Sequence, residues 1–191
     1  GSYLVFRRLR QNVHRFHRFL ADHRGELSAA ALAARICGRW PSRAPIERAP
    51  DADDPALAED NDFDFPAVAS CPGDAHIRKV NPRSDVPEAD RLRHRLLRRG
   101  IPFGDASTST IDDPGDDDGI ERGLLFLAYM TSIVNQFEFV TSAWANNAAF
   151  HAADVGADAL LRQPGESWIV PTGGGYYFSP AVSALKGVLS A

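Results

Sequence analysis

Residues 123–130, GLLFLAYM, form an almost uninterrupted apolar run. A short continuous run of this kind predicts a β-strand that is buried on both faces of a sheet. Thr131 and Ser132 follow it directly, and either hydroxyl can cap a helix. We expect that helix to continue to Asn146, because apolar side chains recur along it at helical spacing. These side chains are Ile133, Phe137, Val140 and Trp144.

The same kinds of pattern predict the remaining elements. Strands are expected at residues 2–7, 76–80, 96–101 and 176–178, and helices at residues 11–20, 28–37, 86–92 and 180–189. Their order along the chain predicts an α+β fold, an antiparallel sheet with helices packed on one face. The ferredoxin-like arrangement is the commonest small form of this fold. We expect residues 1–191 to form one domain.

The composition is that of a globular protein. The 191 residues are 44% hydrophobic and 24% charged, with a net charge of -4, which gives no support for nucleic-acid binding. No apolar run reaches the roughly 18 residues that a membrane-spanning helix needs. Cys37 and Cys71 lie in no CxxC motif and are expected to be free thiols. The chain opens at once on a predicted strand, which indicates the later part of a longer protein.

Two residues bring chemistry to this framework. His76 follows the corner formed by Pro72 and Gly73, and Arg98 lies on the next predicted strand. A neutral imidazole can ligate a haem iron, and a guanidinium can stabilise a developing oxyanion. The pair therefore suggests peroxide activation at haem, although a histidine considered alone is more often structural.

Six strings in order along the chain strengthen this interpretation. They are GSYLVFRRLRQ (1–11), GRWPS (38–42), NDFDF (61–65), AHIRKVNPR (75–83), RHRLLRRGIPFG (93–104) and GLLFLAYMTSIVNQFEFV with WANN (123–147). Together they resemble the C-terminal half of dye-decolourising peroxidases. The resemblance implies a haem-dependent peroxidase that uses hydrogen peroxide to oxidise dyes or phenolic compounds. It also implies non-covalent haem b as the cofactor and an aromatic reductant as the second substrate.

The resemblance assigns roles to single residues. His76 matches the proximal ligand of the haem iron, and Arg98 matches the distal arginine. Candidate partners of the haem propionates are Arg78, Lys79, Arg83 and the basic run at residues 7–10. Strand alternation would place Arg78 on the same face as His76, which favours it. Trp144 is a candidate surface residue for electron transfer from bulky dyes, although core packing is the plainer interpretation. Apolar side chains expected to line the haem pocket, or simply to fill a core, are Leu125, Phe126, Leu127, Ile133 and Phe137.

The family's distal aspartate is expected to come from elsewhere. It belongs to a GxxDG motif in the first half of family members. We do not expect that motif in this chain, where Asp118 and Gly119 lie in an acidic loop of the second half. We therefore expect a missing N-terminal half or another chain to supply it, and we expect a homo-oligomer. Two alternatives stay open. One is a haem-binding or haem-handling module without the full peroxidase machinery, and the other is a structural, oligomerising half-domain.

Overall fold

The computed structural model describes residues 1–150, 152–161 and 167–187. Its centre is a four-stranded sheet with the order β2-β3-β1-β4, in which every neighbouring pair is antiparallel. The strands are β1 (Ser2–Gln11), β2 (Leu97–Phe103), β3 (Gly123–Met130) and β4 (Ile169–Ser179). This strand order, with helical segments between β1 and β2 and between β3 and β4, confirms the α+β ferredoxin-like fold that the sequence predicts.

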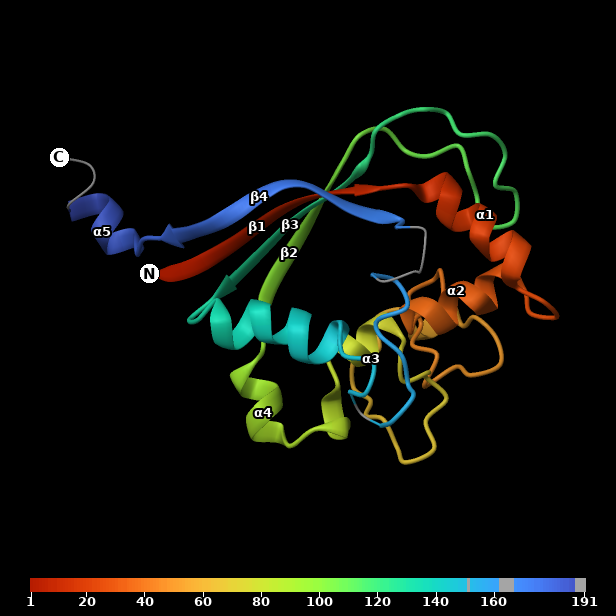
Figure 1. The fold of residues 1–191 in the computed structure, drawn as a ribbon, viewed down its shortest axis with the longest axis horizontal. Helices are drawn as coiled ribbons and strands as arrows, with labels where there is room; N and C mark the ends of the chain where they lie inside the picture. The colour runs from red at the N-terminus through yellow and green to blue at the C-terminus, as the bar shows by residue number, and fades with distance from the viewer. Residues whose placement is uncertain (151, 162–166, 188–191) are drawn as a thin grey trace.

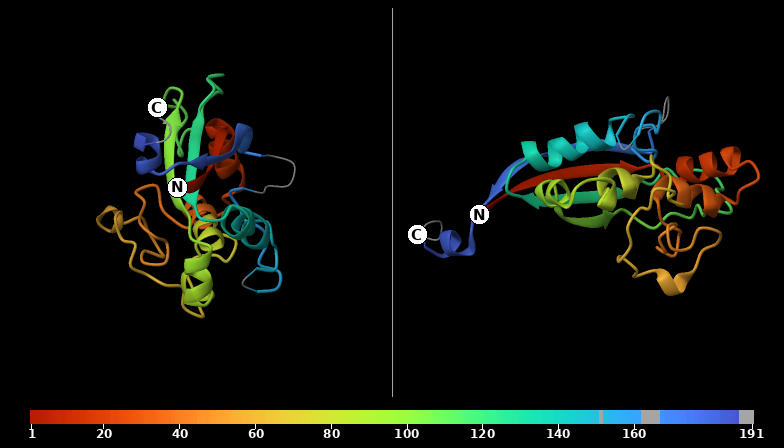
Figure 2. Two further views of the ribbon diagram at one scale, coloured as in Figure 1. Left: turned by 90° about the vertical axis from the view of Figure 1, so that its left-hand side faces the viewer. Right: turned by 90° about the horizontal axis from the view of Figure 1, so that it is seen from below.

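Helices lie beneath one face of the sheet and beyond one of its ends (Figures 1 and 2). The end is occupied by α1 (Val13–His23) and α2 (Ala29–Cys37). The face is covered by α3 (His76–Val80), α4 (Glu88–Arg93) and the π-helical segments η3 (Val134–Glu138) and η4 (Val140–Ala145). The remaining elements are the 3-10 turns η1 (Pro55–Leu57) and η2 (Arg83–Asp85) and the helix α5 (Val182–Gly187) after β4. None of the helices described is both long and apolar enough to span a membrane.

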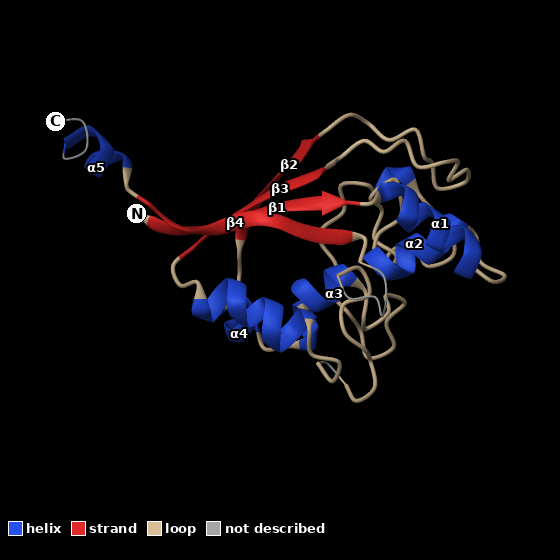
Figure 3. Ribbon diagram, turned by 45° about the horizontal axis from the view of Figure 1, so that its top comes forward, coloured by secondary structure: helices blue, strands red, loops and turns tan. Residues whose placement is uncertain are grey.

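One face of β3 packs on the helices and the other does not. Val5 pairs with Ala128 in the register, and both side chains are fully buried in a cluster that also holds Met130, Ile133 and Phe137. Successive side chains alternate between the faces, so the even-numbered residues of β3 point towards the helices. The other face carries no helix among the described residues (Figure 3). The expectation that this strand is covered on both faces is therefore wrong for the described chain.

The ends of α2 follow the predicted signals. Ser28 caps the helix, since its Oγ accepts a hydrogen bond from the backbone nitrogen of Ala31 at 3.0 Å. Gly38 ends it in the left-handed region at φ 87°. A Cβ at Gly38 would lie 2.3 Å from Cγ1 of Ile77. The glycine thus permits α3 to pack closely on the end of α2.

Two predicted strands differ from the structure. Residues 76–80 form α3, not a strand, and residues 176–178 belong to β4, which begins at Ile169. The early part of β4 contains Pro171 and three consecutive glycines, which weaken any strand signal. Pairing with β1 overrides this, and at Gly174 (φ 147°) a Cβ would lie 2.3 Å from the carbonyl oxygen of Phe6. Of the final predicted helix, α5 is observed, and residues 188–189 lie outside the described part.

Candidate functional site

α3 carries His76 and is held in place by tertiary contacts. The helix has five residues, begins after a turn in which Ala75 donates to the carbonyl of Pro72 at 3.1 Å, and includes Ile77 and Val80. So short a helix is unstable by itself, and β-branched residues favour a strand. Side-chain bonds from three of its five residues, His76, Arg78 and Lys79, supply what local preference does not.

His76 is paired with a buried carboxylate. Its Nδ1 lies 2.7 Å from Oδ2 of Asp158, whose side chain is 0% exposed, while the imidazole itself is 27% exposed. The other oxygen of Asp158 accepts from the backbone nitrogens of Leu160 and Leu161, at 3.0 and 3.1 Å. The carboxylate accepts all three bonds, so Nδ1 of His76 is the donor and carries the ring proton. In the neutral ring, Nε2 is then the nitrogen with the free lone pair, the form in which imidazole binds a metal.

Asp158 has no signal in the sequence that links it to His76. The two residues are 82 positions apart. The structure brings them together through the backbone, because the nitrogen of Asp158 donates to the carbonyl of Ala145 at 2.8 Å and that of Ala159 donates to the carbonyl of Asp74 at 2.9 Å. The second bond fixes the loop of Asp158 directly beside the start of α3.

Arg98 projects from the face of the sheet that the helices cover. It pairs with Ala128 in the register between β2 and β3, so the two side chains leave the sheet on the same face. Arg99 pairs with Leu127 and points to the opposite face. Arg98 is exposed, and no hydrogen bond or ion pair joins its side chain to any residue that the structure describes. Its cation thus lies on the helix-covered face of the sheet without a protein partner among the described residues.

The apolar lining expected for a haem pocket is only partly correct. Phe126, Ile133 and Phe137 do share the helix-covered face, and the rings of Phe126 and Phe137 lie 6.2 Å apart. Leu125 and Leu127 point to the opposite face, so their assignment to the same wall is wrong. Leu124 and Ala128 are the strand neighbours that share the face of Phe126. Alternation alone, applied to Phe126, would have identified them.

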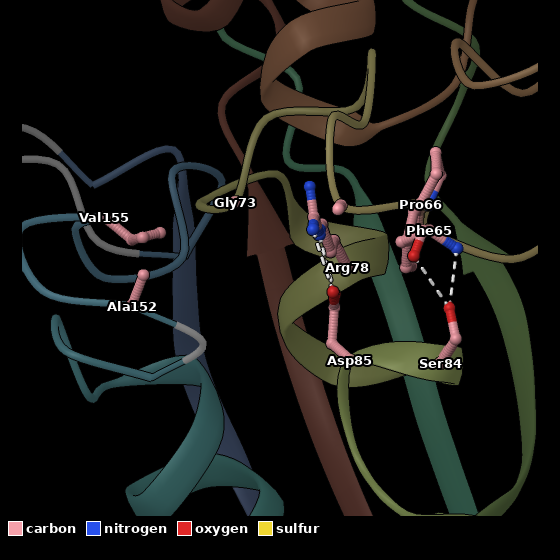
Figure 4. A pocket seen from close by; sticks show the side chains of 9 residues that line it. Phe65, Pro66, Gly73, Arg78, Ser84, Asp85, Ala152 and Val155 are labelled. Atoms are coloured by element: carbon pink, nitrogen blue, oxygen red, sulfur yellow. Dashed lines mark hydrogen bonds and ion pairs between the residues drawn. The ribbon is translucent and has the colours of Figure 1, made fainter.

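Arg78 faces away from the role expected for it. In a helix a residue two positions from His76 lies on a different face, so the expectation based on strand alternation is wrong. Its guanidinium forms a two-pronged ion pair with Asp85, at 2.7 and 2.8 Å, and donates to the carbonyl of Cys71 at 2.7 Å. These contacts lie beside a pocket of about 460 Å³ that is lined by Arg78, Asp85, Phe65 and Ser84, among others (Figure 4). Arg78 ties α3 to η2 and to the loop before it.

Arg83 has a similar structural position. Its Nη1 donates to the carbonyls of Asn61 and Phe63, at 3.0 and 2.5 Å, and its guanidinium stacks 3.8 Å from the centre of the Phe63 ring. Like Arg78, it holds the irregular segment before α3. Both cations already have protein partners, and the structure gives no support for assigning either to a propionate.

Trp144 lies in the interior. It is 5% exposed, stacks on Phe150 at 5.3 Å and meets the rings of His94 and Phe139 edge-on. The surface position expected for this residue is therefore wrong in the described chain. Its contacts with three aromatic rings agree with core packing, the plainer of the two interpretations.

Asp118 also has a structural role. Residues 115–119, GDDDG, do have the GxxDG spacing. Asp118 is bound by both terminal nitrogens of Arg122, at 3.0 and 2.6 Å, and this guanidinium lowers the pKa of the carboxyl group to about 2. The surrounding loop rests on α1, where Nδ1 of His14 contacts the carbonyl of Pro114 at 3.1 Å. The loop carries no link to α3 among the contacts described.

Taken together, these contacts define a class of site: an imidazole backed by a buried carboxylate, in a fold whose sheet presents apolar side chains and the Arg98 cation on its helix-covered face. The sequence model of the family described as Dyp-type peroxidase, C-terminal, matches residues 1–184. The chain belongs to this family of dye-decolorizing peroxidases.

Curated relatives agree with this membership. A dye-decolorizing peroxidase of Mycetinis scorodonius is 36% identical over 241 residues, covering 100% of this chain and 46% of the relative. A multifunctional dye peroxidase of an Amycolatopsis strain is 33% identical over 233 residues, covering 97% of this chain and 48% of the relative. The chain thus spans about half the length of the curated relatives it matches.

Solved structures show the same fold. A dye-decolorizing peroxidase whose heme pocket was engineered for asymmetric sulfoxidation is 34% identical, with a TM-score of 0.85, and the match covers 100% of this chain and 54% of that chain. A complex of a dye-decolorizing peroxidase with 2,6-dimethoxyphenol has 32% identity and a TM-score of 0.80, with 100% and 52% coverage.

Proposed function

We propose that this chain is the haem-binding C-terminal domain of a peroxidase that uses hydrogen peroxide to oxidise dyes or phenolic compounds. The observation that carries the proposal is the pair of His76 and Asp158. A carboxylate with 0% exposure lies at hydrogen-bond distance from Nδ1, while the imidazole keeps 27% exposure. The names of the relatives, and the phenol bound to one solved relative, support the same activity.

The residues present fit haem b. His76 offers a neutral nitrogen ligand, and Phe126, Ile133 and Phe137 offer an apolar surface on one side of the sheet. The sequence has no CxxCH motif, so the attachment we propose is non-covalent. When bound, the haem would supply an iron that exchanges electrons with peroxide and with the reductant.

The chain's own residues act by position and charge. Asp158 holds the His76 ring in one orientation and one tautomer and makes Nε2 a stronger electron donor. Arg98 contributes a permanent positive charge on the helix-covered face. Such a charge attracts a hydroperoxide anion and stabilises negative charge on the oxygen that departs when the O–O bond breaks.

We further propose that the rest of the protein, or a second copy, completes the molecule. The sheet face opposite the helices includes Leu97 and Ile101, which are 74% and 48% exposed. Large apolar side chains at this exposure are usually covered by a partner. The same missing part is the proposed source of a carboxylate that accepts the proton of hydrogen peroxide.

A spectrum of the complete protein supplied with haem tests the proposal. A Soret band that is lost in His76→Ala, together with peroxide-dependent dye bleaching, is expected. Arg98→Leu should keep the Soret band and lower the bleaching rate by about 10²–10³-fold, the usual cost of removing a charge-stabilising donor. A wild-type protein without a Soret band would refute haem binding. A Soret band without any bleaching would instead favour the haem-handling module.

A further inference from the structure

Lys79 is the largest fully buried side chain of the described residues. It lies on α3, one turn after His76, and is 0% exposed. Its Nζ donates to the carbonyl of Asn147 at 2.9 Å and to the carbonyl of Phe150 at 3.1 Å. Burial of a charged ammonium is costly unless hydrogen bonds replace its water. The two carbonyls therefore replace part of the hydration that the buried ammonium of Lys79 loses.

These carbonyls belong to the turn to which the backbone of Asp158 is hydrogen-bonded. The turn, residues 145–150, begins at the last residue of η4, and two further carbonyls in it accept from the returning chain. The carbonyl of Ala145 accepts from the nitrogen of Asp158 at 2.8 Å, and that of Ala148 accepts from the nitrogen of Gly156 at 2.9 Å. Lys79 thus holds the turn from the α3 side, and Asp158 is attached to the same turn by its own backbone.

The contacts form a closed circuit that begins and ends on α3. Lys79 binds the turn, the turn holds the backbone of Asp158, and the carboxylate of Asp158 binds His76. A displacement of the turn therefore displaces the carboxylate with respect to the imidazole. At 2.7 Å the bond between them is short, and its strength falls steeply when distance or angle is changed.

The charge of Lys79 also interacts with nearby carboxylates. No carboxylate forms an ion pair with it among the residues described, and burial lowers its pKa, whereas the charges of Asp74 and Asp158 raise the pKa. The ammonium thus attracts the Asp158 carboxylate in addition to holding the turn by hydrogen bonds.

We propose that Lys79 is a positioning residue for the proximal ligand. Acting through the turn of residues 145–150, it places Asp158 so that His76 keeps its proton on Nδ1 and its lone pair on Nε2. The inference rests on the proposed function only in naming His76 as the haem ligand; the circuit itself concerns the protein without haem.

Nitrogen-15 NMR of the histidine-labelled, haem-free complete protein tests the circuit. In the wild type, we expect His76 to be the Nδ1–H tautomer with a slowly exchanging ring proton. Lys79→Met keeps the length of the side chain and removes its charge and donors, so this proton should exchange at least about tenfold faster, in line with the usual cost of losing an outer partner of a metal ligand. Arg78→Met is the matched control, because Arg78 is also a tethered cation on α3 but binds Asp85 and Cys71.

The results separate positioning from general stability. Unchanged exchange in Lys79→Met would overturn the inference, and so would equal acceleration in Arg78→Met, since both would then act only by loosening α3. If Lys79→Met does not fold, Lys79→Gln, which keeps one amide donor, should give an intermediate exchange rate. A wild-type rate in Lys79→Gln would equally overturn the proposal.

The haem-loaded protein gives an independent measurement. In Lys79→Met, we expect haem to dissociate about tenfold faster and the midpoint potential of the iron to rise, because a less firmly held Nδ1 proton makes His76 a weaker donor. A wild-type midpoint potential in Lys79→Met would contradict the proposal. If the wild type binds no haem but exchange responds as expected, the proposed function fails and the positioning role stands.

Discussion

Replacement of Asp158 by asparagine reverses the hydrogen bond on which the proposed ligand depends. The amide has the size of the carboxylate, and its oxygen still accepts from the backbone nitrogens of Leu160 and Leu161. The amide nitrogen then faces Nδ1 of His76, where the carboxylate oxygen lies at 2.7 Å in the wild type. Because an amide nitrogen only donates, Nδ1 must accept and the ring proton moves to Nε2. The nitrogen intended for the metal is then blocked.

The size of the effect follows from the burial of the pair. Asp158 is 0% exposed, so water does not replace the lost interaction. A hydrogen bond to a charged group contributes about 1.5–3 kcal/mol. Changes to the outer partner of a ligating histidine typically lower metal affinity about 10–100-fold, which corresponds to about 1.4–2.7 kcal/mol. The two ranges of free energy overlap, so we expect Asp158→Asn to weaken haem binding about 10–100-fold.

Titration of haem into the haem-free protein, followed at the Soret band, measures this affinity. Asp74→Asn is the control, because it removes a carboxylate from the same region but keeps the backbone carbonyl that accepts from Ala159 in the loop of Asp158. Nitrogen-15 shifts of His76 should report the change of tautomer in Asp158→Asn alone. Haem affinity within twofold of the wild type, with the proton still on Nδ1, would refute the reasoning.

Three further predictions concern groups outside this pair. Arg122 lowers the pKa of Asp118 from 3.8 to about 2. The ion pair therefore stabilises the fold fully above pH 3.8, and this stabilisation is lost as pH falls through about 2. Urea unfolding should show the loss in the wild type but not in Asp118→Asn. Burial raises the pKa of Cys37 to about 11 and that of Cys71 to about 12, so neither should react with a thiol reagent at pH 8 until urea unfolds the chain, and rapid native labelling would contradict this. Because the indole of Trp144 is buried, Trp144→Phe should lower the free energy of unfolding by about 1–3 kcal/mol. The oxidation rates of small and bulky reductants should change to the same extent. A selective loss of bulky-dye oxidation at unchanged stability would restore the electron-transfer role.

Much of the scaffold was predictable because its signals are local. The apolar run and its length identified β3 to the residue, and Ser28 and Gly38 marked the ends of α2. The ordered strings identified the family and singled out His76. The strand predicted at residues 76–80 was wrong because five residues with Ile77 and Val80 favour extended backbone, and only contacts made elsewhere in the chain turn them into a helix.

The sequence by itself therefore determined the fold class, the family and the position of the candidate ligand, since each depends on patterns within one segment or on ordered strings. Only the tertiary structure decided what surrounds that ligand. It paired His76 with Asp158 and joined Lys79 to the turn of residues 145–150. It also paired Arg78 with Asp85, away from the role expected for Arg78. Partners 68 and 82 positions apart become neighbours only when the whole chain closes its backbone bonds, and no short-range periodicity encodes that closure.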